Sequence, residues 1–153
     1  MPKTKNKYSY PVELTPNVRI ALDESPAHIG KLKHAVDFIV IEGTPIKAAA
    51  SGIVVDVKQD SNISGPTKNF DKFGNYIEIK HNSNEYSIYE HIKNSGSLVK
   101  KGDKVKQGQI IGYSGNTGWI AHLGPHVHFD VHKYLGKGKE NYATIQIVWK
   151  RKK

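Results

Sequence analysis

The chain has 153 residues, enough for one domain with a substantial core, and it contains no cysteine. This composition excludes a disulfide framework and a thiolate zinc site, so histidines and carboxylates would have to hold any metal. The net charge of +9 favours an anionic partner, either a nucleic acid or an anionic cell-wall polymer, although much of the excess lies in the lysine-rich ends of the chain.

The sequence predicts neither a targeting signal nor a membrane span. Tyr8-Ser9-Tyr10-Pro11 stands where the apolar region of a signal peptide would begin. No apolar run approaches the roughly 20 residues that cross a bilayer. We therefore expect a soluble monomer that acts at the cell wall if it is exported or released, and in the cytoplasm otherwise.

The domain organisation is predicted to be simple. Residues 1–24 are expected to form an N-terminal arm that packs on the domain, residues 25–150 the single domain, and residues 151–153 a basic tail. The apolar side chains of the arm could contact the sheet: Tyr8, Tyr10, Val12, Leu14, Val18 and Ile20.

Short β-branched and aromatic runs, separated by Gly, Asn, Asp or Pro, dominate the rest of the chain. The predicted strands are 38–41, 52–57, 76–80, 86–89, 110–113, 126–131 and 144–149. Residues 81–84 predict a hairpin turn between two of them. Helical periodicity is hard to find anywhere, so we expect an all-β domain, an antiparallel sandwich or a barrel-like sheet with long loops framing a groove.

Two similar segments indicate an internal duplication. Residues 43–47 and residues 102–106 both have the pattern G-x-x-[I/V]-K, and an apolar strand follows each of them. Folds built from two similar β-motifs show such a repeat. The longest irregular stretch, 59–72, is either a functional lid or a mobile insertion.

The pair His126 and His128 is the strongest chemical signal. Residues at i and i+2 of a strand point to the same face, so the two imidazoles can address one metal ion or one reacting group. Asp37 directly precedes an apolar run, an unusual place for a carboxylate unless it is bound or capped. A catalytic zinc site needs three such ligands and an open position for water.

The third ligand could be His28 or His34. His34 is three residues from Asp37, and on a continuous strand an odd separation places two side chains on opposite faces. His28 lies in a predicted loop that can bring it round to the site. The spacing therefore favours His28 and leaves His34 a packing or hydrogen-bonding role.

The ordered set of motifs resembles the lysostaphin-type zinc endopeptidases over about residues 25–132. The first segments are His28-x-Gly30-x-Leu32-x-His34-Ala35-Val36-Asp37-Phe38 and Glu42-Gly43-Thr44-Pro45-Ile46-Lys47-Ala48-Ala49. The middle segments are Gly74-Asn75-Tyr76-Ile77, Tyr89-Glu90-His91-Ile92 and Val99-Lys100-Lys101-Gly102-Asp103-x-Val105-x-x-Gly108-Gln109. The last are Ser114-Gly115-Asn116-Thr117-Gly118 and Gly124-Pro125-His126-Val127-His128-Phe129.

The resemblance implies a duplicated hybrid fold and a residue-by-residue assignment. The zinc ligands would be His28, Asp37 and His128, and the catalytic histidines would be His91 and His126. The commonest pattern of the family has its first ligand four residues before the aspartate, where this chain has Lys33. Other members resemble this chain in placing the ligand nine residues upstream.

Several further residues receive weaker predictions. The loop before the H-x-H strand is expected to line a substrate groove, so Trp119 and His122 are candidate substrate contacts, together with Asn116. His132 shares a strand face with the histidine pair and could support it from behind. Glu90, by alternation with His91, is expected to face away from the site.

The combined interpretation is a zinc endopeptidase that hydrolyses peptidoglycan stems or cross-bridges. Two neutral imidazoles and one carboxylate would leave zinc a net positive charge. The two catalytic histidines would accept a proton from water and donate one to the leaving amine. One alternative is a catalytically silent peptidoglycan-binding or regulatory module of the same fold. Another is a phosphocarrier domain, which also uses a histidine pair but no metal. No nucleic-acid partner is expected, because charge alone supports one.

Overall fold

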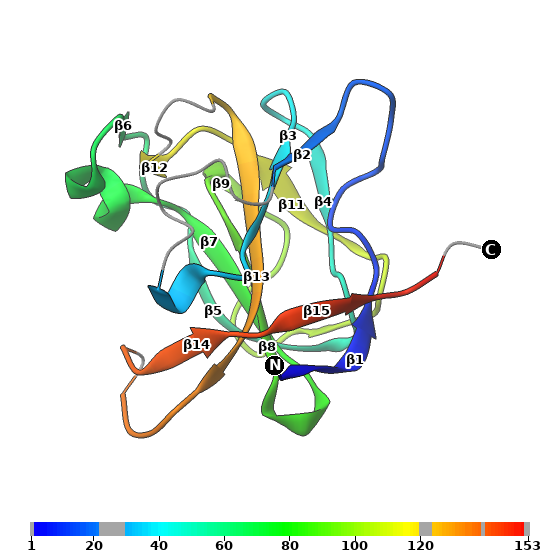
Figure 1. Cartoon of the computed structure of the whole chain (residues 1–153). Helices are drawn as coiled ribbons and strands as arrows, with labels where there is room; N and C mark the ends of the chain where they lie inside the picture. The colour runs from blue at the N-terminus through cyan, green and yellow to red at the C-terminus, as the bar shows by residue number, and fades with distance from the viewer. Residues whose placement is uncertain (1, 22–29, 120–123, 139, 152–153) are drawn as a thin grey trace.

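The computed structural model describes residues 2–21, 30–119, 124–138 and 140–151 (Figure 1). These residues form an all-β domain, as predicted, in which the helical segments are three short 3-10 turns: η1 (Gly30–Leu32), η2 (Lys68–Phe73) and η3 (Asn82–Asn84). Within the described ranges no helix is long and apolar enough to cross a membrane.

An eight-stranded sheet carries most of the domain. Its order is β10-β5-β7-β8-β13-β3-β2, and β14 pairs with the far end of β13. The bounds are β2 (Arg19–Ala21), β3 (Val36–Ile39), β5 (Gly52–Lys58), β7 (Tyr76–Lys80), β8 (Tyr86–Glu90), β10 (Lys104–Val105), β13 (His126–Tyr134) and β14 (Tyr142–Thr144). The predicted hairpin turn at residues 81–84 joins β7 to β8, which pair antiparallel.

The nine residues of β13 divide cleanly between two faces of this sheet. Val127, Phe129 and Val131 are completely buried on one face, against a core that includes Phe38 and Tyr89. The intervening residues point the other way because strand side chains alternate. The apolar half of β13 therefore anchors the strand in the core, and its polar half is presented on the opposite face.

A three-stranded sheet covers the core from the other side. It consists of β4 (Pro45–Lys47), β11 (Ile110–Ser114) and β9 (Ile92–Ser97). The predicted repeat explains its pairing: β4 of the first copy pairs with β11 of the second, while β10 of the second pairs with β5 of the first. This reciprocal exchange of strands is the arrangement expected of two interlocked β-motifs.

The N-terminal arm is more deeply built into the domain than predicted. β1 (Lys3–Tyr8) pairs parallel with β15 (Gln146–Trp149), and the blue and red strands run side by side in Figure 1. β2 forms one edge of the main sheet. Tyr8 and Val12 are buried in the core, whereas Ile20, predicted as a contact, is 39% exposed because it lies on that edge strand.

The predicted strand 144–149 is two strands. β14 pairs with β13 in the main sheet and β15 pairs with β1, so the chain changes sheets at Ile145. Ile145 is buried, and its N–H donates to the carbonyl of Val131. The apolar run was continuous in sequence, and only the change of pairing partner divides it.

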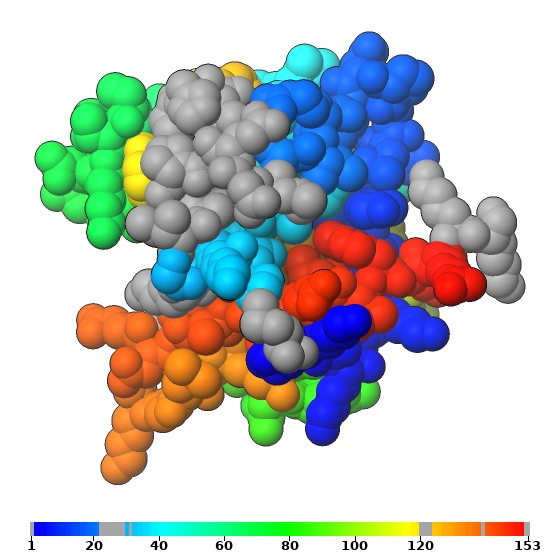
Figure 2. Space-filling model, in the orientation of Figure 1, coloured from blue at the N-terminus to red at the C-terminus, as the bar shows by residue number. Residues whose placement is uncertain are grey.

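The irregular stretch 59–72 packs as a wall at one end of the main sheet. β6 (Ser64–Gly65) pairs parallel with β12 (Gly118–Trp119), and η2 lies against β12 (Figure 2). The ring of Phe70 covers Gly65, where an added Cβ would lie 2.3 Å from ring atoms. Only glycine permits this approach, so the wall depends on position 65.

The side chain of Glu85 fastens the N-terminal arm to the main sheet. Its buried carboxylate accepts hydrogen bonds from the backbone N–H groups of Lys5 and Asn6, the Asn6 amide and the Tyr8 hydroxyl. We expect Glu85→Ala to lower the free energy of unfolding by about 3 kcal/mol, because it leaves buried donors unsatisfied. Urea denaturation measures the change. Glu42→Ala, at an exposed position, is the control, and equal losses in both variants would contradict the role of Glu85.

Candidate metal centre

Four ionisable side chains follow one another on the polar face of β13. His126, His128, Asp130 and His132 are each less than 5% exposed. Burying such groups is costly unless they are paired with one another or with a ligand. A run of this kind, backed by an apolar face, indicates a built site and not a solvated surface.

Strand register brings Asp37 to this face. In the pairing of β13 with β3, His128 is directly opposite Asp37, and directly opposite residues of antiparallel strands share a face. The Oδ1 atom of Asp37 lies 3.5 Å from Nδ1 of His128 and 3.8 Å from Nε2 of His126. Asp37 is completely buried.

The separation of these donors fits zinc. Tetrahedral zinc with bonds of about 2.1 Å holds neighbouring donor atoms about 3.4 Å apart. Asp37 and His128 meet this spacing at 3.5 Å, and they supply the carboxylate and imidazole donors that suit the ion. His28, the predicted third ligand, lies outside the described residues.

His34 lies in a different environment. It lines a cavity with Val36, Gln146 and Trp149, and its backbone N–H donates to the Thr144 hydroxyl. The chain around it is a turn that precedes β3, so the alternation assumed from the sequence does not start until Val36. This position agrees with a packing role for His34.

The predicted catalytic histidines lie beside the donor pair. The rings of His91 and His126 are 4.4 Å apart between centroids, and the ring of His91 is 6.3 Å from that of His128. Nδ1 of His91 lies 2.6 Å from the carbonyl of Thr117, and Nδ1 of His126 lies 2.7 Å from that of Gly124. A carbonyl only accepts, so both Nδ1 atoms donate and both Nε2 atoms keep a lone pair.

The electrostatics keep His91 neutral. Burial, together with the neighbouring His126 and His128, lowers the pKa of its imidazole to about 3, against the hydrogen bond to Thr117 and the attraction of Asp37. A neutral imidazole with a free Nε2 lone pair can accept a proton, which an imidazolium cannot.

Asn75 holds the backbone of His91 in an unusual conformation. His91 has a φ of 70°, which non-glycine residues rarely adopt. Its N–H donates to the carbonyl of Asn75, whose own side chain donates to Ser61 and Ile92. The sequence motif that contains Asn75 predicts no role for this residue. Its functional signal was the Gly-Asn pair before a strand.

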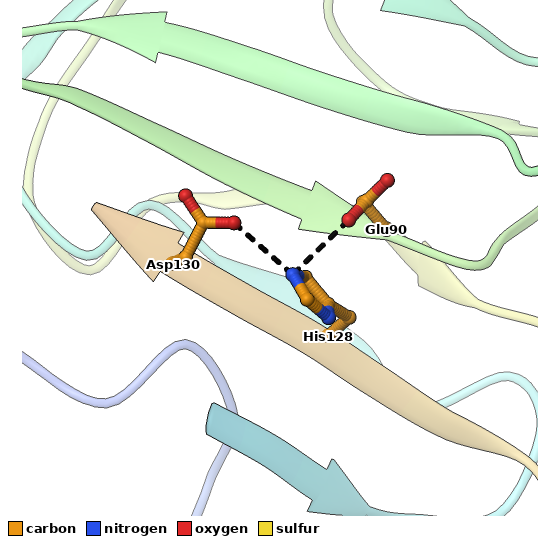
Figure 3. A group of neighbouring side chains, drawn as sticks. All are labelled: Glu90, His128 and Asp130. Carbon is orange, nitrogen blue, oxygen red and sulfur yellow. Dashed lines mark hydrogen bonds and ion pairs between the residues drawn. The ribbon is translucent and has the colours of Figure 1, made fainter. Parts of the chain in front are cut away.

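The prediction that Glu90 faces away from the site is wrong. His128 pairs directly with Glu90 of β8, so the two share a face. Nε2 of His128 lies 3.1 Å from the Glu90 carboxylate and 3.0 Å from that of Asp130 (Figure 3). The positive φ of His91 breaks the strict alternation, so Glu90 and His91 both approach His128.

These three side chains form a second group with metal-type donors, opposite the side of the ring that faces Asp37. Partial burial, with the nearby Asp130 carboxylate, raises the pKa of Glu90 to about 7, against the attraction of His128. Burial also opposes charge on His128, but Glu90, Asp130 and Asp37 outweigh it and raise the pKa well above the ordinary value. A metal bound at Nδ1 must therefore displace a proton, and its affinity must fall in acid.

A chain of hydrogen bonds continues behind His128. Asp130 contacts Nδ1 of His132 at 2.7 Å, and Nε2 of His132 contacts Glu78 at 2.7 Å. The prediction that His132 supports the histidine pair thus has a structural basis through Asp130. Asp130 received no role from the sequence, although its i+2 spacing from His128 was the available signal.

The three candidate substrate contacts are placed differently. The indole of Trp119 donates to the carbonyl of Pro66 across the β12–β6 pair, at the wall beside the site. Asn116 lies one residue from Thr117, which holds His91, and among the described residues its buried Oδ1 has no hydrogen-bond partner. His122 lies outside the described residues.

Comparison with known proteins agrees with this geometry. The sequence pattern of "Peptidase family M23" matches residues 31–142. The chain is 39% identical over 98 residues to peptidoglycan DD-endopeptidase ShyA of Vibrio cholerae, covering 64% of this chain and 20% of that protein. It is 41% identical over 101 residues to lysostaphin of Staphylococcus simulans, covering 65% of this chain and 18% of lysostaphin.

A solved structure shares the fold over nearly its whole length. The catalytic domain of the prophage-encoded M23 protein EnpA from Enterococcus faecalis superposes with a TM-score of 0.62 and 29% identity. The match covers 90% of this chain and 94% of that one. The chain spans about a fifth of the length of the curated relatives named above.

The buried position of His132 makes the free energy of unfolding depend on pH. Burial alone lowers its pKa, but hydrogen bonds to Asp130 and Glu78 raise the pKa from 6.5 to about 9. The folded state holds this proton more tightly than the unfolded state. The stabilisation is therefore complete below about pH 6.5 and lost as the pH rises through about 9.

We expect the metal-free wild type to lose about 3 kcal/mol of unfolding free energy over this range relative to His132→Gln. Urea denaturation in the presence of a chelator, between about pH 6 and about pH 10, measures the difference. His34→Gln should follow the wild type. Parallel curves for wild type and His132→Gln would show that His132 does not titrate as described.

Proposed function

We propose that this chain, which belongs to peptidase family M23, is a zinc-dependent endopeptidase that hydrolyses peptide bonds of peptidoglycan. The observation that carries the proposal is that Asp37 Oδ1 and His128 Nδ1 lie 3.5 Å apart in a buried site, beside two histidines whose Nδ1 atoms both donate to backbone carbonyls. A phosphocarrier needs no carboxylate there, since that chemistry uses imidazoles alone.

The metal is proposed to be held by Asp37, His128 and His28. When bound, zinc supplies a Lewis acid that polarises an amide carbonyl and acidifies a water molecule. The position of His34 in a separate cavity supports His28 as the third donor. Two neutral imidazoles and one carboxylate leave the ion its net positive charge.

His91 and His126 are proposed to move the protons. The Nε2 atom of one imidazole accepts the proton of the attacking water, because its Nδ1–H already donates to a backbone carbonyl. The same nitrogen, once protonated, can donate to the leaving amine. The other imidazole orients the scissile amide and stabilises the developing negative charge on its oxygen.

The proposed substrate follows from the relatives and from charge. ShyA is named a peptidoglycan DD-endopeptidase, and peptidoglycan stems and cross-bridges both offer peptide bonds. A net charge of +9 favours approach to an anionic cell wall, where such an enzyme would act. Trp119, Asn116 and His122 are the proposed contacts to the peptide.

Zinc content tests the proposed ligands. We expect close to one zinc per chain in the wild type and a large loss in Asp37→Ala and His28→Ala, because removing one of three donors costs most of the affinity. Elemental analysis of the purified variants measures it. His34→Ala is the matched control and should keep its zinc. Loss in His34→Ala with retention in His28→Ala would move the ligand to His34.

Cleavage of purified peptidoglycan tests the proton-transfer roles. We expect His91→Ala and His126→Ala to release new amines at least about 100-fold more slowly than the wild type, because each loses an acid–base group. Both variants should retain zinc, which separates catalysis from metal binding. A zinc-loaded wild type that releases no amines from any cell-wall preparation would favour a silent binding module.

A further inference from the structure

Two carboxylates compete for one nitrogen of His128. The carboxylates of Glu90, from β8, and Asp130, from β13, lie 3.1 Å and 3.0 Å from Nε2 (Figure 3). A neutral imidazole that donates its Nδ1 lone pair to a metal carries one hydrogen, on Nε2, and can give it to one strong acceptor. The distances are too similar to choose between the two carboxylates, so the choice depends on how each is held.

Asp130 is held in place by a series of buried hydrogen bonds on the side away from His128. Its second oxygen contacts Nδ1 of His132 at 2.7 Å, and the opposite ring nitrogen contacts Glu78 at 2.7 Å. The Tyr134 hydroxyl donates to the same Glu78 oxygen at 2.5 Å. The ring of Tyr86 stacks on His132 with an interplanar angle of 11°.

Burial reinforces this rigidity. Asp130 is 1% exposed, His132 3% and Glu78 4%, so water has little access to the chain of hydrogen bonds. Asp130 cannot turn from His128 without also breaking its contact to Nδ1 of His132, which would leave that buried nitrogen without an acceptor.

Glu90 is held more loosely. Its side chain is 28% exposed and one methylene longer than that of Asp130, so water competes for its oxygens and more rotamers are open to it. Among the described side chains, Glu90 forms an ion pair only with His128. The cavity of about 150 Å³ beside Glu90 is also lined by Asp130 and His132, so the two carboxylates differ in their exposure and in their partners and not in access to this cavity.

We propose that Asp130, fixed by His132 and Glu78, is a positioning residue that takes the Nε2 hydrogen of His128 and so keeps Nδ1 free for the metal. The inference rests on the proposed zinc site. The role of Asp130 is to select the tautomer of His128. Without a fixed acceptor at Nε2, the hydrogen can lie on Nδ1, which then has no lone pair to donate to zinc. Glu90, in contrast, is dispensable for the tautomer.

The matched pair Asp130→Asn and Glu90→Gln tests this assignment, because each substitution removes the negative charge of one carboxylate and keeps the size and shape of its side chain. We expect zinc affinity, measured by competition with a chromophoric chelator, to fall about 10- to 100-fold in Asp130→Asn and by less than about threefold in Glu90→Gln. His132→Gln, which leaves Asp130 without its support, should fall in between. This third variant also keeps the test open if Asp130→Asn does not fold.

The tautomer itself gives a readout that a purely structural role would not move. In the zinc-loaded wild type, nitrogen-15 NMR should find the hydrogen of His128 on Nε2. In metal-free Asp130→Asn at a pH where the ring is neutral, a substantial share should move to Nδ1, while Glu90→Gln should keep the wild-type position.

The outcomes separate the two proposals. A wild type that binds no zinc overturns the proposed function and the inference with it. Zinc binding that is unchanged in Asp130→Asn, or lost in Glu90→Gln instead, overturns the inference and leaves the proposed function standing. Two zinc ions per wild-type chain would also overturn it, because Nε2 of His128 would then be a ligand of a second ion together with Glu90 and Asp130.

Discussion

The structure depends on the pairing of β13 with β8 on one side and β3 on the other. This register sets Glu90 and Asp37 directly opposite His128, one on each neighbouring strand. A slip of one residue in either pairing would turn the opposing carboxylate to the other face of the sheet. The apolar face of β13 prevents such a slip, because Phe129 and its neighbours would then leave the core. Packing on one side of the strand therefore guarantees the chemistry on the other.

The site concentrates charge where burial alone would oppose it. The histidines and carboxylates of the polar face stabilise one another through the ion pair of Asp37 with His128 and a hydrogen-bonded chain from His128 through Asp130 and His132 to Glu78. Such a network fixes ring orientation and tautomer more firmly than single contacts to water can. The same low-dielectric surroundings keep His91 neutral. Preorganisation of this kind is what a metal-assisted hydrolysis requires from its protein.

The walls of the site come from parts of the chain that are far apart in sequence. The wall built by β6, β12 and η2 stands at one end of the main sheet, and Thr117, next to β12, also holds the His91 ring. The N-terminal arm contributes at the opposite side of the core, where Glu85 fastens it. The wall that holds the His91 ring and the contact that fastens the arm thus lie in separate regions of one domain, and substitutions in the two regions should act independently.

The sequence by itself determined the β class, the central strands of the main sheet and the repeat, because alternation and motif order are local properties of the chain. His126 and His128 share a face by spacing alone, and Asp37 was marked by its place before an apolar run. The sequence left Glu90 on the wrong face, missed Asp130 and Asn75, and ran β14 and β15 together. Only tertiary structure decided these points. A positive φ at His91, cross-strand register and a change of sheet at Ile145 arise from partners distant in the chain, which no local pattern encodes.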